Sequence, residues 1–262
     1  MAPKRASMED SVRQLLADVA AGRISVDDAT KRLRTMGLAA VGDFACLDLG
    51  RSQRKGVPEV VLGQGKSSEQ VVAIVQAFLK HGTSVLCSRM SAEQAAAVSA
   101  AGVAAEYDPR SSMLVARRDD YESPPQRGVV GVLAAGTSDV PIAEEAAAVC
   151  REMGVAVETA YDVGVAGVHR LGAPLERIMA AGAAALVVAA GMEGALPSVV
   201  AGLVDVPVIG LPTSTGYGLG GRGEAALLGM LQSCTPGLVV VNVDNGVGAG
   251  ATAALIARPC AP

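Results

Sequence analysis

One stretch of the sequence gathers side chains that suit metal binding, phosphate binding and acid–base chemistry. Residues 161–170 read Tyr-Asp-Val-Gly-Val-Ala-Gly-Val-His-Arg, and the whole chain has only 2 His. Asp162 and His169 are of the types that bind a divalent metal ion, and Arg170 is suited to an anionic substrate. Simpler alternatives stay open, because His169 also fits a surface position and Arg170 an ordinary ion pair.

A second candidate is a cysteine in a turn. Cys234 stands before Thr-Pro-Gly, between a predicted helix that ends at Gln232 and a predicted strand that begins at Leu238. A thiol in such a turn, near bound cations, can act as a thiolate nucleophile, whereas most free cysteines are buried and inert. The 5 Cys are odd in number and show no CxxC spacing, so neither a disulfide framework nor a zinc site is indicated.

Glu193 is the candidate general base. It follows an apolar run in the segment Ala-Gly-Met-Glu-Gly-Ala-Leu-Pro and precedes a helix of small residues. A carboxylate that is partly desolvated there can take up a proton or bind a metal. The alternative is that an acidic residue near a helix N-terminus is simply favoured by the helix dipole.

Two further turns carry polar groups that suit a nucleotide. The turn Gly136-Thr137-Ser138-Asp139 leads into a predicted helix, whose N-terminus would bind phosphate, although it also reads as an ordinary capped turn. Asn242 and Asp244 stand at the end of the last predicted strand. Their side chains suit the binding of ribose, phosphate or a metal, and they equally suit a plain turn. The glycine- and hydroxyl-rich residues 212–222 suit a mobile flap over a ligand.

These segments are brought together by a predicted parallel sheet. Apolar runs alternate with helical patterns throughout the second half of the chain, which requires right-handed crossovers. Ligands bind beyond the carboxyl ends of the strands in such sheets, which is where the polar turns begin. The strands are predicted at 128–133, 155–160, 184–189, 207–211 and 238–243, and the helices at 140–153, 171–181, 194–203, 223–232 and 247–257.

The first half of the chain predicts a helical hairpin, at 8–20 and 26–36, followed by a small α/β subdomain. Its strands are expected at 44–49, 59–62 and 84–87, and its helices at 67–79 and 91–101. The polar stretch 117–127 reads as a linker, so the predicted domains are 1–126 and 127–262. Arg51, Arg54 and Lys66 are expected in loops beside short strands, where they bind substrate phosphate or carboxylate, or form solvated surface charge.

Composition excludes several classes of protein. A net charge of −4, no Trp and 2% aromatic residues do not suit a nucleic-acid binder. The apolar runs are shorter than the roughly 18 residues of a membrane span, so no membrane partner is expected. Glu9, Asp10 and Arg13 occupy the place of a signal peptide's apolar stretch, which predicts a cytoplasmic protein. The lack of nucleic-acid-binding character predicts a small substrate.

Taken in order, these segments resemble the phosphoribosylaminoimidazole carboxylase superfamily and, within it, the LarB family. The Gly-Thr-Ser-Asp turn and the Gly-Met-Glu-Gly-Ala-Leu-Pro segment match the superfamily. The segment 161–170 and the sequence Cys-Thr-Pro-Gly-Leu-Val-Val-Val-Asn-Val-Asp-Asn-Gly distinguish the LarB family. The same pattern in the N-terminal half includes Asp48, Arg51, Arg54, Gly56, Pro58, Glu59, Gly63, Gly65 and Lys66.

The resemblance implies a flavodoxin-like three-layer sandwich that forms homo-octamers, with a smaller N-terminal helical and α/β domain. It implies carboxylation of the pyridinium ring of nicotinic acid adenine dinucleotide by carbon dioxide or bicarbonate, followed by hydrolysis of the phosphoanhydride. The products would be AMP and pyridinium-3,5-biscarboxylic acid mononucleotide, a precursor of the nickel-pincer cofactor of lactate racemization. Cys234 corresponds to the family's nucleophile and Glu193 to a base; for the hydrolysis we expect a divalent ion, Mg²⁺, on Asp162 and His169.

Two other functions stay open. A purine-type aminoimidazole ribonucleotide carboxylase or mutase would use the same turns without a thiol. A non-enzymatic nucleotide-binding module would hold a ligand in them without reaction, although Cys, Glu, Asp and His at strand ends favour an enzyme.

Overall fold

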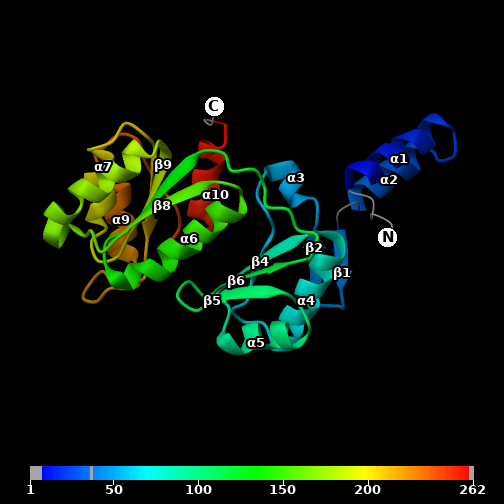
Figure 1. Cartoon of the computed structure of the whole chain (residues 1–262), viewed down its shortest axis with the longest axis horizontal. Coiled ribbons are helices and arrows are strands. Elements are labelled where there is room, and N and C mark those ends of the chain that lie inside the picture. The colour runs from blue at the N-terminus through cyan, green and yellow to red at the C-terminus, as the bar shows by residue number, and fades with distance from the viewer. Residues whose placement is uncertain (1–7, 36–37, 260–262) are drawn as a thin grey trace.

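The computed structural model describes residues 8–35 and 38–259. The chain begins with the predicted hairpin of α1 (Met8–Ala20) and α2 (Val26–Thr35), which pack on each other and bury Leu15 and Ala29. The Ser25 hydroxyl accepts a hydrogen bond from the Asp28 backbone N–H at 3.0 Å and so caps the N-terminus of α2. Figure 1 shows this hairpin at the opposite end of the molecule from the C-terminal sheet.

An α/β unit with two sheets follows the hairpin. A two-stranded antiparallel sheet precedes a four-stranded sheet of order β3-β4-β6-β5. Two capping boxes are present, with Ser67 and Gln70 opening one helix and Ser91 and Gln94 the other. The elements are β1 (Leu38–Val41), β2 (Ala45–Asp48), α3 (Arg51–Lys55), β3 (Val60–Leu62), α4 (Ser68–His81), β4 (Ser84–Ser88), α5 (Ala92–Ala100), β5 (Ala105–Asp108) and β6 (Met113–Arg117).

Sequence patterns did not identify four of these elements. The strands β1, β5 and β6 have only four or five residues each, which is too short for a pattern of alternating side chains to stand out. The prediction that Arg51 and Arg54 lie in loops is wrong, because both belong to α3, which ends at Gly56 with φ of 66°. A helix of five residues is too short to produce a recognisable 3.6-residue period.

The second half forms the predicted five-stranded parallel sheet. Its order is β11-β10-β9-β7-β8, which is the flavodoxin-like arrangement. The strands are β7 (Val129–Ala134), β8 (Ala156–Tyr161), β9 (Ala183–Ala190), β10 (Val208–Pro212) and β11 (Leu238–Val240). The helices are α6 (Val140–Glu152), α7 (Gly172–Ala180), α8 (Ala195–Ala201), α9 (Glu224–Leu231) and α10 (Gly246–Ala257), with 3₁₀ turns η1 (Thr137–Asp139) and η2 (Val165–Arg170).

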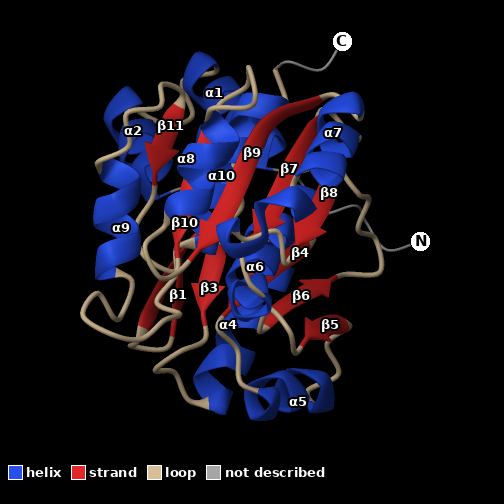
Figure 2. Cartoon of the chain, turned by 90° about the vertical axis from the view of Figure 1, so that its left-hand side faces the viewer, coloured by secondary structure: helices blue, strands red, loops and turns tan. Residues whose placement is uncertain are grey.

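Helices cover both faces of this sheet, as Figure 2 shows. Two helices, α6 and α10, pack on one face of the sheet and form one buried apolar cluster with it. The helices α7, α8 and α9 pack on the other face and form a second cluster. Leu86 and Met113 of the N-terminal sheet belong to the same buried cluster as α6 and α10. The N-terminal unit therefore packs on α6 and α10, which cover one face of the five-stranded sheet.

Small residues make this arrangement possible. A Cβ at Gly250 of α10 would lie 2.3 Å from the Ala146 carbonyl oxygen of α6, so the two helices touch through their backbones. Among the residues that the structure describes, no helix has the length and apolar character to cross a membrane.

Candidate active site

A cavity of about 500 Å³ lies at the carboxyl ends of β7, β8, β9 and β10. This is the edge where parallel sheets bind ligands. The polar or charged side chains in its wall are Ser138, Asp139, Asp162, Arg170, Glu193, Thr215 and Tyr217, and the backbone of Gly136 and Gly191 also lines it.

Asp139 is the buried acid of this cavity. Its side chain is 5% exposed, and its carboxylate accepts hydrogen bonds from the Thr213 hydroxyl at 2.6 Å and the Gly136 backbone N–H at 2.9 Å. Burial raises the pKa of Asp139; the hydrogen bonds from Thr213, Gly136 and Gly191 oppose that rise. The Asp139 side chain makes no cap bond to α6, because its carboxylate instead joins the turn after β7 to the end of β10.

Asp162 and Arg170 form an ion pair across the second turn. The Arg170 Nη1 lies 2.6 Å from Asp162 Oδ2, and both side chains remain substantially exposed at the cavity wall. Asp162 has a left-handed backbone with φ of 58°, which directs the chain from β8 into η2. His169, on the same 3₁₀ turn, is exposed and does not line the cavity.

Glu193 stands at the mouth of the cavity, exposed, on the turn between β9 and α8. Two constraints fix this turn: Met192 has φ of 51° and Gly194 has φ of 66°. A Cβ on Gly191 would lie 2.1 Å from the Thr215 carbonyl oxygen, so glycine is required for residues 212–222 to approach Glu193. The flap also contacts the first turn, where the Thr215 hydroxyl donates to the Ser138 carbonyl oxygen at 3.3 Å.

Asp244, in the turn after β11, connects the residues 212–222 to the N-terminal unit. The Asp244 carboxylate accepts from the Ser214 backbone N–H at 2.8 Å, while its carbonyl oxygen accepts from Arg89 at 2.7 Å. The Asn242 side chain accepts from the Val243 N–H at 2.9 Å, so it stabilises its own turn. Neither Asn242 nor Asp244 lines the cavity, but Asp244 joins the flap to the N-terminal unit.

Sequence reasoning missed Arg89 and Glu145. Arg89 follows β4 with φ of 51° and also donates to Gln64 at 3.3 Å. Glu145, on α6, is 3% exposed beneath the first turn of α10, and its Oε2 is buried without a hydrogen-bond partner. The sequence shows Arg89 only as a charged residue at a strand end and Glu145 only as an acid at an apolar helix position. Neither pattern indicates which residues these side chains contact.

Burial raises the pKa of Glu145 to about 7, although Arg89 and the Gly246 and Val247 N–H groups oppose the rise. The folded state therefore holds a proton that the unfolded chain releases near pH 4.5. The stability contributed by this proton is complete at lower pH and is lost as the pH rises through about 7.

Glu145→Gln is expected to remove this pH dependence. Between about pH 5 and pH 8 the wild type should lose about 3 kcal/mol of unfolding free energy that the Gln variant does not lose. Urea unfolding at both pH values measures the difference, with Glu176→Gln on exposed α7 as the matched control. Equal destabilisation by Glu145→Gln at both pH values would contradict the assignment.

Arg51 and Lys66, two of the cations predicted in the N-terminal half, do not line the cavity. Arg51 pairs with Glu59 at 3.2 Å, and the Lys66 ammonium donates to the Leu62 carbonyl oxygen at 2.8 Å. The side chain of Arg54 lies outside the described part of the structure. Thr137 is exposed on η1 beside the cavity. Substrate binding by these residues stays a prediction.

Among the described cysteines, two are exposed and two are buried. Burial raises the pKa of Cys87 and Cys150 to about 12, so these thiols are poor nucleophiles near neutral pH. Cys46 and Cys234 are exposed. Cys234, however, precedes β11 and lies at the amino ends of the strands, so the chain does not bring it to its own cavity.

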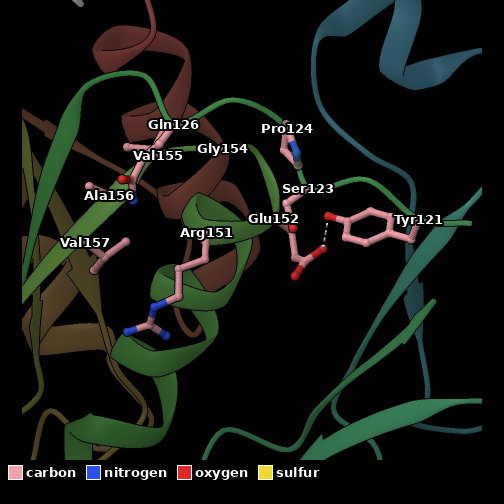
Figure 3. A pocket seen from close by; sticks show the side chains of 10 residues that line it. All are labelled: Tyr121, Ser123, Pro124, Gln126, Arg151, Glu152, Gly154, Val155, Ala156 and Val157. Carbon is pink, nitrogen blue, oxygen red and sulfur yellow. Dashed lines mark hydrogen bonds between the residues drawn. The ribbon is translucent and has the colours of Figure 1, made fainter. Parts of the chain in front are cut away.

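A second cavity, of about 490 Å³, lies between the linker and the amino end of β8 (Figure 3). Its Glu152 carboxylate is already bound by Arg117 and accepts from the Tyr121 hydroxyl at 3.3 Å. The other polar side chains in its wall are Ser123, Gln126 and Arg151. Its only acidic side chain, Glu152, is already paired, and its wall contains no other base or nucleophile. We therefore place the active site in the first cavity.

The predicted metal ligands are not assembled as a protein-only site. Asp162 is bound by Arg170, and His169 lies outside the cavity wall. Over residues 8–35 and 38–259, no three side chains of His, Cys, Asp or Glu meet in a metal-binding group. The donor set does not fit a metal held by the protein alone.

Comparison with known proteins adds the family. The profile described as LarB/PurE-like N-terminal domain matches residues 39–118, and the AIR carboxylase profile matches residues 129–260. An uncharacterized protein of Methanocaldococcus jannaschii is 41% identical over 256 residues, which cover 96% of this chain and 98% of that protein. The chain belongs to the LarB family.

A second relative matches the sheet domain alone. The N5-carboxyaminoimidazole ribonucleotide mutase of the same organism is 34% identical over 130 residues, or 49% of this chain and 76% of that protein. The chain thus combines an AIR carboxylase domain with a LarB/PurE-like N-terminal domain. Together these matches support a carboxylase-type role.

Proposed function

We propose that the chain carboxylates the pyridinium ring of nicotinic acid adenine dinucleotide and then hydrolyses the phosphoanhydride. The products are pyridinium-3,5-biscarboxylic acid mononucleotide and AMP. The observation that carries the proposal is the cavity at the strand ends, where Glu193, Arg170 and the Gly136 turn meet in about 500 Å³. A base, a cation and a phosphate-binding turn are the groups that this anionic substrate needs.

The chemistry requires a nucleophile because a pyridinium ring is electron-poor and does not attack carbon dioxide. Addition of the Cys234 thiolate, which in the proposed homo-octamer would have to come from a neighbouring copy of the chain, forms a carbon–sulfur bond. The ring then becomes an enamine, whose carbon meta to nitrogen is nucleophilic. That carbon forms a bond to carbon dioxide. Loss of its proton to Glu193 and departure of the thiolate then restore the aromatic ring, with no net oxidation or reduction.

The remaining side chains of the cavity bind and orient. The Ser138 hydroxyl and the turn from Gly136 to Asp139 are proposed to bind substrate phosphate. Arg170 is held by Asp162 in the absence of substrate, and a phosphate would replace that carboxylate as its partner. Asp139 fixes the shape of the cavity through Thr213 and the Gly136 N–H.

The rest of the proposal follows the family. Arg51, Arg54, Lys66, Asn242 and Asp244 are proposed to contact the outer part of the dinucleotide. Mg²⁺ with Asp162 and His169 is proposed to accompany the diphosphate. The enzyme would act in the cytoplasm as a homo-octamer, and its product would enter nickel-pincer cofactor biosynthesis.

Incubation with nicotinic acid adenine dinucleotide and ¹³C-bicarbonate tests the function directly. Mass spectrometry is expected to show a mononucleotide that has gained one labelled carboxyl group, together with an equal amount of AMP. Omission of bicarbonate should prevent the gain. Absence of both products from correctly folded protein would overturn the proposal.

The purine-type alternative is tested in the same assay with aminoimidazole ribonucleotide and its carboxylated form. It is the weaker candidate because the mutase match covers 49% of this chain, whereas a LarB/PurE-like N-terminal profile covers residues 39–118. Tight binding of the dinucleotide without any turnover would instead favour the non-enzymatic module.

A further inference from the structure

Arg89 joins the N-terminal unit to the turn after β11. Its Nη2 donates to the Asp244 carbonyl oxygen at 2.7 Å, and its Nη1 donates to the Gln64 side chain at 3.3 Å. The guanidinium thus bridges the loop after β3 and a turn of the five-stranded sheet domain. A hydrogen bond from a charged donor is stronger than one between neutral groups, so this bridge is a firm one.

The backbone on both sides of Arg89 is fixed. The Ser88 carbonyl oxygen accepts from the Gly63 N–H at 2.8 Å. The buried Met90 donates its N–H to the Ser112 carbonyl oxygen at 2.9 Å. Arg89 itself has φ of 51°, a left-handed conformation that a non-glycine residue keeps only where its surroundings hold it. The guanidinium therefore extends from a defined position at the edge of the N-terminal unit.

The turn that accepts this bond also holds the flap, residues 212–222. The Asp244 N–H donates to the Pro212 carbonyl oxygen at 2.9 Å, and the Asp244 carboxylate accepts from the Ser214 N–H at 2.8 Å. Asp244 is left-handed as well, with φ of 55°. One residue therefore connects Arg89 to the start of the flap.

The flap in turn reaches the turn of the candidate base. The Thr215 carbonyl oxygen accepts from the Met192 N–H at 3.3 Å, and Met192 directly precedes Glu193. Thr215 and Tyr217 both line the cavity. A continuous path of hydrogen bonds and short backbone segments thus leads from the N-terminal unit through the flap to Glu193.

We infer that Arg89 is a positioning residue for the carboxylation, an inference that rests on the proposed function. It acts through Asp244, holds the flap against the cavity, and so keeps Glu193 in place beside the pyridinium ring. A surface loop rich in glycine has many accessible conformations and needs an outside constraint to keep one of them. The N-terminal unit supplies that constraint, which gives this unit a part in the reaction.

Another arginine bridges the same two units away from the flap. Arg258, directly after α10, donates to the Gly56 carbonyl oxygen at the end of α3 at 3.0 Å. This contact is of the same kind as that of Arg89, an arginine on a carbonyl oxygen across the two units. Substitution of Arg258 therefore gives a matched control for loss of a bridge that does not end at the flap.

Amide hydrogen exchange of the ligand-free protein tests the inference without the reaction. In Arg89→Ala the peptides that cover residues 213–222 are expected to exchange about tenfold faster, because the Ser214 N–H loses a fixed acceptor. Exchange in β9 should not change, and Arg258→Ala should leave the flap as in the wild type. Arg89→Lys should restore part of the protection, since an ammonium also binds a carbonyl oxygen. Wild-type exchange of the flap in Arg89→Ala would overturn the inference.

Steady-state carboxylation of nicotinic acid adenine dinucleotide separates positioning from direct substrate binding. A displaced flap and base should lower kcat by about a factor of 10 and raise KM as well, whereas a lost substrate contact would raise KM alone. A raised KM with unchanged kcat and unchanged exchange would assign Arg89 to the substrate and overturn the inference. Absence of carboxylation by the wild type would overturn the proposed function, and the exchange experiment would still decide whether Arg89 orders the flap.

Discussion

Cys234→Ser is expected to lower kcat/KM for ring carboxylation by a factor on the order of 10³ or more, while the chain folds and assembles as before. A serine hydroxyl is hardly ionised near neutral pH, and an alkoxide is a poor leaving group when the aromatic ring must be restored. The side chain is exposed, so the substitution leaves the core untouched. Carboxylation measured with labelled bicarbonate gives the loss directly.

Cys46→Ser is the matched control, because Cys46 is also exposed but stands in β2 of the N-terminal unit. It should retain full activity. An analogue that cannot complete the reaction should add its mass to the wild-type peptide that contains Cys234 and to no other. Near-normal carboxylation by Cys234→Ser would remove covalent catalysis and make the purine-type mechanism the better account.

Glu193→Gln is expected to reduce carboxylation by a factor of about 10² to 10⁴, the range of general acid–base contributions. The amide has nearly the same shape as the carboxylate but does not take up the ring proton. Addition of the thiolate and capture of carbon dioxide precede that step, so the carboxylated adduct on Cys234 should accumulate. Rapid acid quench followed by peptide mass spectrometry measures the adduct.

Glu176→Gln, on the exposed surface of α7, serves as the control for charge loss. It should change neither the rate nor the adduct. A Glu193→Gln variant that slows the reaction without accumulating adduct would assign Glu193 to substrate binding, and the base would then have to be another group.

Local sequence was sufficient for the elements of the catalytic sheet. Long apolar runs that alternate with helical patterns predicted all five strands and their crossovers within a few residues, because strand and helix periods are properties of contiguous residues. Parallel order then placed the turns of Gly136, Asp162 and Glu193 at one edge, and the structure brings these three into one cavity. In the N-terminal half, β1, α3, β5 and β6 were too short to carry such a period.

Tertiary packing decided the partners of the charged groups and the position of the thiol. Arg170 pairs with Asp162, and Arg89 reaches the Asp244 carbonyl oxygen 155 residues away, because the N-terminal unit packs on α6 and α10. The same packing buries Glu145 and raises its pKa to about 7. Sequence places Cys234 before β11, but only the direction of the strands shows that this position faces away from the cavity. A motif specifies which groups a reaction uses, whereas distances between groups that are remote in sequence depend on how the layers pack.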